Sequence, residues 1–319
     1  MNPRSAPAAL MSVVVFLTCL VGLAATSTTA HATYPGTDGR IAFVRGTQVY
    51  SMDQSGRDVR QLTSTGRSSR PTWSPDGRRI AFIREAGGRR DVWVMAANGS
   101  DERRVTTSGA VTSAGATWSP DGRRLAYAEP GADGWSQLMT IRSTAPYGAP
   151  RVITGDQTGG FCGGDDAEMQ PVRVNQYLAW SPDGTRIAVR TDSDCRLDFR
   201  VDHYYVATGE SRMVLESGGD CCGYVDYTNL FWGPGNQFGY TERDRGEYGE
   251  DTDAPTYIVY PGFQSVAGDT GGAPSPSGAF LALSTTASGT SVIVRARADG
   301  SARTVLTRGS QPDWQARPR

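Results

Sequence analysis

The stretch "PTWSPDGRRIAF" at residues 71–82 recurs as "ATWSPDGRRLAY" at 116–127 and as "LAWSPDGTRIAV" at 178–189. In each copy a tryptophan precedes Ser-Pro-Asp-Gly, and an apolar run follows it. The run is shorter than a typical helix and is rich in β-branched residues, as in a strand. Each copy therefore predicts one β-hairpin of a repeated unit.

The Ser-Pro-Asp-Gly segment has the composition of a tight turn. In the first copy Pro75 presets φ for the second turn position, and Asp76 can cap its own backbone. Gly77 accepts the positive φ that such a turn requires. Turn geometry explains these residues, so the motif does not by itself predict an active site.

The full repeat contains four strand-like segments. After the hairpin come a second apolar run, "DVWVMAANG" at 91–99, and a polar segment that ends in Val-Thr. The unit starts at Trp73, Trp118, Trp180 and Trp232, and a copy without the tryptophan starts at Pro274. Four short strands joined by tight turns, repeated at intervals of roughly 40–60 residues, predict the blades of a β-propeller.

The two ends of the repeat region complement each other. Residues 36–65 match the unit but lack its first strand, whereas "SQPDWQ" at 310–315 resembles that first strand. A C-terminal strand that completes the N-terminal blade closes the ring and removes an open sheet edge. The sequence thus predicts an all-β chain that forms a six-bladed β-propeller of four-stranded blades.

The repeated pattern W-S-P-D-G-x-x-[IL]-A-[FYV], followed by a strand, a turn and Val/Leu-Thr, resembles the PD40 (WD40-like) repeats of TolB-like six-bladed propellers. The resemblance covers about residues 34–316, without the α/β domain that precedes the propeller in TolB. It implies the fold but no single activity, because propellers host many unrelated functions.

The N-terminal segment has the features of a signal peptide. Arg4 precedes the apolar run at 13–25, and "AHA" at 30–32 fits the small-x-small rule of signal peptidase. We expect cleavage of residues 1–32 and one exported propeller domain at 33–319, secreted or held in the cell envelope. No later segment approaches the roughly 20 apolar residues of a membrane-spanning helix.

Net charge and cysteine content narrow the class of protein further. The formal net charge of −1 argues against a nucleic-acid partner. Four cysteines follow the predicted signal peptide, and an even number in an exported chain favours disulfides; they are Cys162, Cys195, Cys221 and Cys222. Either Cys162 and Cys195 each bond one member of the adjacent pair, or they bond each other and the adjacent pair forms its own bridge.

Strand order assigns the loops to two faces of the ring. The Ser-Pro-Asp-Gly turn and the turn between strands three and four of a blade lie on one face. The loops between strands two and three and the linkers between blades lie on the other, which we call the loop face. The long non-repeating segments fall there, over blades 3 to 5, at 129–137, 155–177, 191–199, 216–229 and 242–255. Long loops in compact domains often carry function.

Two kinds of side chain in these segments are candidates for partner binding, since exposed aromatics anchor interfaces and acidic groups add polar contacts. The candidates are Trp135, Asp165, Asp166, Glu168, Asp220, Tyr224, Asp226, Tyr227 and Tyr248. Four of them are also candidate Ca²⁺ ligands, because Ca²⁺ takes six to eight oxygens; these are Asp165, Asp166, Asp220 and Asp226. The ligand spacing of a Ca²⁺ loop is missing, so we expect no firm metal site and no other cofactor.

Catalysis has little support in the sequence. Of the two histidines, His31 lies in the predicted signal peptide and His203 lies in an apolar strand, where a packed side chain is expected. We predict no catalytic residue and expect a monomeric, non-catalytic binding or scaffold propeller that recognises a protein or glycan partner. The alternative is a Ca²⁺-dependent propeller hydrolase or lyase that uses the acidic loop residues.

Overall fold

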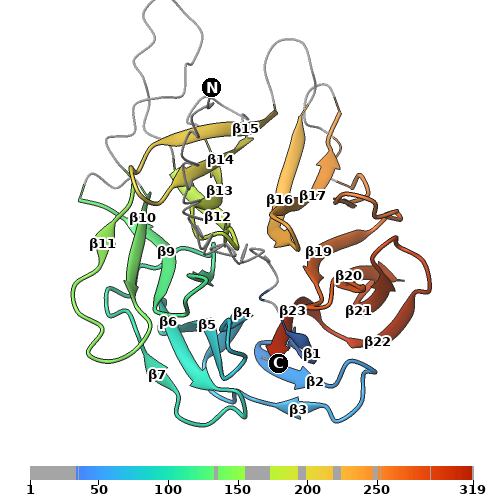
Figure 1. The fold of residues 1–319 in the computed structure, drawn as a ribbon, viewed down its shortest axis with the longest axis horizontal. Helices are drawn as coiled ribbons and strands as arrows, with labels where there is room; N and C mark the ends of the chain where they lie inside the picture. The colour runs from blue at the N-terminus through green and yellow to red at the C-terminus, as the bar shows by residue number, and fades with distance from the viewer. Residues whose placement is uncertain are drawn as a thin grey trace, which may run out of the picture.

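The computed structural model is a ring of six antiparallel β-sheets (Figure 1). It describes the following parts of the chain: residue 34, 36–132, 136–154, 173–192, 199–217, 224–246, residue 251, 253–287 and 289–317. These residues contain 23 strands and no helix. The prediction of a six-bladed, all-β propeller is confirmed.

Each sheet is one blade, and its first strand lies at the centre of the ring. Blade 1 contains β23 (Ser310–Arg317), β1 (Thr37–Arg45), β2 (Gln48–Met52) and β3 (Arg60–Gln61). Blade 2 contains β4 (Arg67–Trp73), β5 (Arg79–Ala86), β6 (Arg89–Ala96) and β7 (Arg103–Arg104). Blade 3 contains β8 (Ala116–Trp118), β9 (Arg124–Pro130), β10 (Ser136–Arg142) and β11 (Arg151–Val152).

The second half of the ring follows the same order. Blade 4 contains β12 (Arg173–Trp180), β13 (Arg186–Asp192), β14 (Phe199–Tyr205) and β15 (Ser211–Ser217). Blade 5 contains β16 (Val225–Gly233), β17 (Gln237–Asp244) and β18 (Tyr257–Val259). Blade 6 contains β19 (Asp269–Pro274), β20 (Phe280–Ala287), β21 (Thr290–Arg297) and β22 (Thr304–Arg308). Blade 5 thus has three strands in the described residues, one fewer than its neighbours.

The second strand of a blade is apolar at consecutive positions because it packs against both neighbouring blades. In β5, Ile80 and Phe82 pack with blade 1, whereas Ala81 and Ile83 pack with blade 3. Six such clusters fill the six interfaces between blades, and the last joins blade 6 to blade 1. The core is therefore a closed ring of interfaces around the axis.

The Ser-Pro-Asp-Gly turns are held by their own side chains. In blade 2 the hydroxyl of Ser74 donates to Oδ1 of Asp76 at 2.6 Å, and the same carboxylate oxygen accepts from the backbone N–H of Arg78 at 3.1 Å. Gly77 has φ of 65°, as the turn requires. The backbone and side-chain hydrogen bonds hold the pKa of Asp76 below its usual value, against the effect of burial. The predicted structural role of the motif is confirmed.

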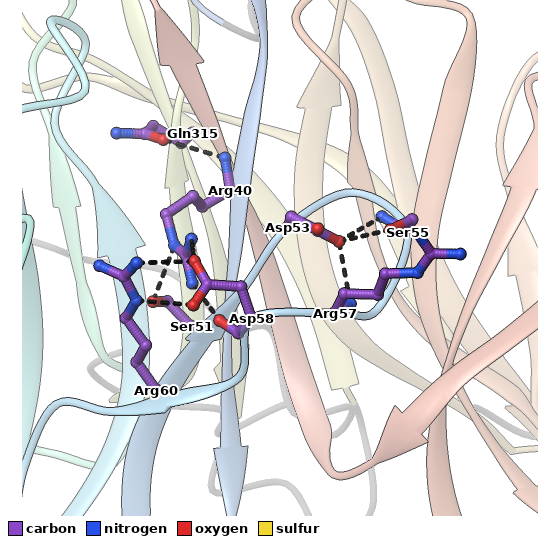
Figure 2. A network of polar contacts seen from close by, with 8 residues as sticks. All are labelled: Arg40, Ser51, Asp53, Ser55, Arg57, Asp58, Arg60 and Gln315. Carbon is purple, nitrogen blue, oxygen red and sulfur yellow. Dashed lines mark hydrogen bonds and ion pairs between the residues drawn. The ribbon is translucent and has the colours of Figure 1, made fainter.

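The ring closes where the two ends of the described chain pair with each other. Strand β1 pairs antiparallel with β23, with Ile41 opposite Trp314. The amide of Gln315 accepts from the backbone N–H of Arg40 at 2.9 Å and donates to the backbone oxygen of Gly77 at 2.7 Å. Figure 2 shows Gln315 beside Arg40, and Nη1 of the Arg40 guanidinium donates to Oδ2 of Asp58 at 2.7 Å. This side chain therefore joins β1 to the first turn of blade 2, and the predicted C-terminal closure is confirmed.

Candidate functional site

One position in every blade has a left-handed backbone, three residues before the tryptophan or its equivalent. These six residues are Arg70 (φ 53°), Gly115 (φ 98°), Tyr177 (φ 57°), Asn229 (φ 48°), Gly271 (φ 64°) and Gln311 (φ 54°). All six line one cavity at the centre of the ring, and we call them the channel ring. Arginine, tyrosine and glutamine rarely adopt positive φ, and such strain is concentrated at functional sites.

The backbone conformation follows from a break in strand pairing. Between β4 and β5 the register shifts from Ser69 to Thr72, and equivalent shifts occur in the other blades whose first strand spans this position. A β-bulge leaves its extra residue unpaired and redirects the side chain. The bulge therefore brings one side chain per blade to the wall of the central cavity.

Arg70 extends over the neighbouring blade to reach the far side of the cavity. Its guanidinium carbon lies 4.1 Å from the centroid of the Tyr177 ring, and Nη1 donates to Oδ1 of Asn229 at 3.4 Å. Its backbone N–H donates to Oε1 of Gln311 at 2.8 Å. A β-carbon on Gly115 would lie 3.2 Å from the β-carbon of Arg70, so glycine leaves room for this side chain. Two members of the channel ring, Tyr177 and Asn229, thus contact the guanidinium of Arg70, and Gln311 contacts its backbone.

Asp313 contributes a carboxyl group to the wall of the same cavity. Its Oδ2 accepts from the backbone N–H of Trp73 at 2.6 Å. Burial raises the pKa of Asp313 to about 7, although hydrogen bonds from Trp73, Trp314 and Thr72 oppose the shift. A carboxyl group that changes charge near neutral pH beside a cavity is a candidate functional group.

Tyr34 lies at the turn end of the same cavity. Its hydroxyl donates to the backbone oxygen of Trp118 at 3.0 Å, and burial, with Asp313 and Asp121 nearby, raises the pKa of the phenol. The cavity has a volume of about 200 Å³ and is walled by the first strands of all six blades. It is therefore a small site with both polar and apolar lining, encircled by the six blades.

The comparisons with known proteins agree with the repeat and with the ring. The family described as "PD40: TolB beta propeller domain" matches residues 32–154. TolB from Acinetobacter baumannii superposes with a TM-score of 0.57 at 16% identity, over 87% of this chain and 67% of that protein. A putative TolB from Agrobacterium tumefaciens gives a TM-score of 0.58 at 18% identity, over 86% of this chain and 91% of that protein.

The chain is a six-bladed β-propeller, and its residues 32–154 are similar to the TolB β-propeller family with PD40 repeats. In sequence, 56 residues are 43% identical to Tol-Pal system protein TolB 1 of Novosphingobium aromaticivorans, covering 17% of this chain and 12% of that protein. The chain thus matches about an eighth of the length of this relative. At the identities of the two solved structures, the likeness concerns the fold.

Three of the partner-binding candidates lie in the described part of this propeller, at the start of blade 5. Tyr224 pairs with the end of β17 through its backbone, donating to Gly246 at 2.9 Å and accepting from Arg245 at 2.7 Å. The carboxylate of Asp226 lies 3.6 Å from the guanidinium of Arg190 and 4.0 Å from that of Arg245. Asp226 is therefore the acidic partner of two arginines at the loop face.

The position of Tyr227 corrects the sequence prediction. It was predicted to lie in a loop, but it belongs to β16 and is 8% exposed. Its ring meets Tyr240 edge to face at a centroid distance of 5.5 Å, and its hydroxyl donates to the backbone oxygen of Glu216 at 3.1 Å. The side chain is consequently part of the packing between blades 4 and 5.

The other predicted site residues lie outside the described residues. They are Trp135, Cys162, Asp165, Asp166, Glu168, Cys195, Asp220, Cys221, Cys222 and Tyr248. The proposed disulfides and most candidate Ca²⁺ ligands are therefore among them. Within the described residues, no group of three potential metal ligands converges.

His203 has the packed environment that its strand predicts. Its ring lies 5.1 Å from that of Trp232 and 5.0 Å from that of Phe238, measured between centroids. Burial, with smaller contributions from Arg186 and Arg212, lowers its pKa to about 4. The imidazole is therefore neutral at physiological pH and lies between aromatic side chains.

We expect the Asp313→Asn variant to gain thermal stability over the native chain as pH rises. The folded pKa of about 7 lies above the unfolded value of 3.8, so folding favours the protonated carboxyl group. Its contribution to stability is complete below pH 3.8 and is lost as pH rises through 7. Melting temperatures of both proteins at about pH 5 and about pH 8 check this. Parallel pH profiles would contradict a buried, ionising Asp313.

Proposed function

We propose that this TolB-like propeller is an exported, non-catalytic binding or scaffold protein that recognises a protein or glycan partner through the loop face of blades 3 to 5. The observation that carries the proposal is the uneven length of the connections on that face. Between strands two and three, blades 1 and 2 have the short turns 46–47 and 87–88, whereas blade 5 has 245–256. The linker from blade 3 to blade 4 spans 153–172. A propeller needs only short connections, so such additions favour recognition.

Charge at the same face supports a polar partner surface. Asp226 is shared between two guanidinium groups, with distances of 3.6 and 4.0 Å. Burial, with Asp244 nearby, raises the pKa of Glu242 on the adjacent strand. A rim with charges of both signs suits a partner that carries hydrogen-bonding groups, either a protein surface or a glycan.

The preference for binding over catalysis rests on the titratable groups available. A nucleophile needs a base within hydrogen-bonding reach, and His203 is packed between aromatic rings with its pKa lowered to about 4. We therefore propose a recognition role, with the protein acting as a monomer.

A cell-envelope or extracellular location fits the predicted signal peptide and the name of the relative, Tol-Pal system protein TolB 1. No helix in the described residues has the length and apolarity to cross a membrane. The intact mass of the exported protein tests this part: it should correspond to a chain that starts after residue 32, lighter by four hydrogens if the four cysteines form two bridges. A full-length reduced mass would contradict it.

The partner proposal is tested by exchanging loops on the two faces. Residues 159–168 and 218–223 are replaced by Gly-Ser segments of equal length, and a control carries the same change at the Asn98-Gly99 turn on the opposite face. Each tagged variant is used to recover partners from the envelope and culture medium of the producing cell. We expect the loop-face variant to lose partners that the native protein and control retain. Equal recovery by all three would refute the loop face as the binding surface.

A further inference from the structure

The wall of the central cavity contains one basic and one acidic side chain that form no ion pair with each other. Arg70 and Asp313 are the charged residues among its lining. Neither belongs to an ion pair with another residue in the described part of the chain. A charge taken out of water without a partner costs folding free energy. The ring nevertheless keeps the side chains of Arg70 and Asp313 on the wall of one cavity of about 200 Å³.

The guanidinium of Arg70 is positioned to receive a carboxylate. Its guanidinium carbon lies 4.1 Å from the centroid of the Tyr177 ring, a cation–π contact that helps to hold the group in place without using its N–H donors. Its side-chain hydrogen bond to Asn229 uses Nη1. An arginine fixed in this way can still present two parallel N–H groups to a carboxylate. The amide of Gln311 lies beside it and accepts the backbone N–H of Arg70, so its own NH₂ can add a further donor.

The carboxyl group of Asp313 offers the complementary charge. Its partners are the backbone N–H groups of Trp73 and Trp314 and the hydroxyl of Thr72, all of them neutral. Backbone donors fix the carboxyl group in place, as they do in sites that bind an ammonium group through a carboxylate. An incoming ammonium ion would supply the cation that the packing around Asp313 lacks.

We propose that the central cavity is a binding site for a small zwitterion, whose carboxylate binds Arg70 and whose ammonium group binds Asp313. Both residues line a cavity of about 200 Å³, which is smaller than the roughly 300–1,000 Å³ of drug-sized sites. A zwitterion that binds there must therefore be small, and an amino acid with a short spacer between its two charges satisfies this limit.

The direct test is a series of probes measured by isothermal titration calorimetry on the full exported chain. Glycine, β-alanine and 4-aminobutanoate vary the distance between the charges, while acetate and methylammonium each carry one charge. We expect at least one of the three zwitterions to bind about tenfold more tightly than either single-charge probe. Equal binding of acetate and the zwitterions, or no binding up to about 10 mM, would overturn the proposal.

Two substitutions assign each charge to its residue. Arg70→Met should abolish binding of acetate and of the zwitterions alike. Asp313→Asn should leave acetate binding unchanged and remove the advantage of the zwitterions. Arg70→Lys keeps the charge but loses the planar fork, so it should weaken zwitterion binding by about tenfold or more. Melting temperatures identify any variant that fails to fold, and the probe series on the native chain decides the question without them.

This site is independent of the partner surface at the loop face. The loop-exchange variants keep Arg70 and Asp313 and should bind the zwitterion normally. The Arg70 and Asp313 variants should likewise recover envelope partners as the native chain does. Failure of one proposal therefore leaves the other open to its own experiment.

Discussion

Replacing Gly77 by alanine is expected to lower the free energy of unfolding by about 3 kcal/mol or more. Gly77 has φ of 65°, and a β-carbon there would lie 2.0 Å from the backbone oxygen of Ala316. Alanine would therefore meet both an unfavourable backbone region and the strand that closes the ring. Equilibrium denaturation in urea, compared between the variant and the native chain, measures the loss.

Gly122 provides the matched control for this change. It occupies the same position of the repeat with φ of 67°, but its nearest contact would be Cδ of Pro75 at 3.6 Å. Alanine at Gly122 should therefore lower the free energy of unfolding only because its backbone must adopt a positive φ, by about 1–2 kcal/mol. Equal losses at the two positions would show that the closing strand does not pack against the first turn of blade 2.

Removal of residues 310–319 is expected to abolish the cooperative thermal transition. The deletion takes away β23, the inner partner of β1, together with Trp314, which is 4% exposed in the cluster between blades 6 and 1. Loss of a buried tryptophan side chain alone costs about 3–5 kcal/mol, a large part of the 5–15 kcal/mol that stabilises a typical domain. Circular dichroism against temperature checks the result.

Two controls separate ring closure from a general effect of truncation. A chain that ends at Arg317 retains all of β23 and should melt like the native protein. A synthetic peptide of residues 310–317, added to the truncated chain, should restore a transition whose midpoint rises with peptide concentration. A truncated chain with the native melting temperature would mean that β23 does not close the ring.

The repeat made the fold predictable because its residues act locally. Asp76 hydrogen-bonds within its own turn, and the paired apolar positions of β5 reflect burial on two sides. The C-terminal closure was predictable because "SQPDWQ" supplies the strand that the first blade lacks. Such features depend on neighbours a few residues away or on the repeat itself, and both are visible in one sequence.

The channel ring was not predicted, although its six residues occupy the same position in the aligned repeats. The position three residues before the tryptophan reads Arg, Gly, Tyr, Asn, Gly and Gln around the ring, and no shared chemistry marks it. Its common property is a backbone angle, which emerges only when the bulge forms. The raised pKa of Asp313 likewise depends on its burial in the closed ring, beside the backbone N–H of Trp73, a residue 240 positions earlier in the chain.

The prediction for Tyr227 failed for a related reason. Its position beside a cysteine-rich segment that breaks the repeat suggested a loop, but β16 begins two residues earlier, at Val225. The strand pairs with β17 from its first residue, Val225, which lies opposite Asp244. It continues past a register shift between Thr228 and Phe231. Side-chain burial at the end of a strand depends on the neighbouring blade, which the local sequence does not specify.

Site-specific photo-crosslinking in the producing cell tests most directly the proposal that this propeller binds its partner through the loop face. A photoreactive phenylalanine analogue is placed at Tyr224, beside Asp226 on the loop face, and in a second strain at Asn98, in a turn on the opposite face. We expect discrete crosslinked products from the chain labelled at Tyr224 and none from the chain labelled at Asn98. Products from Asn98 alone would contradict it.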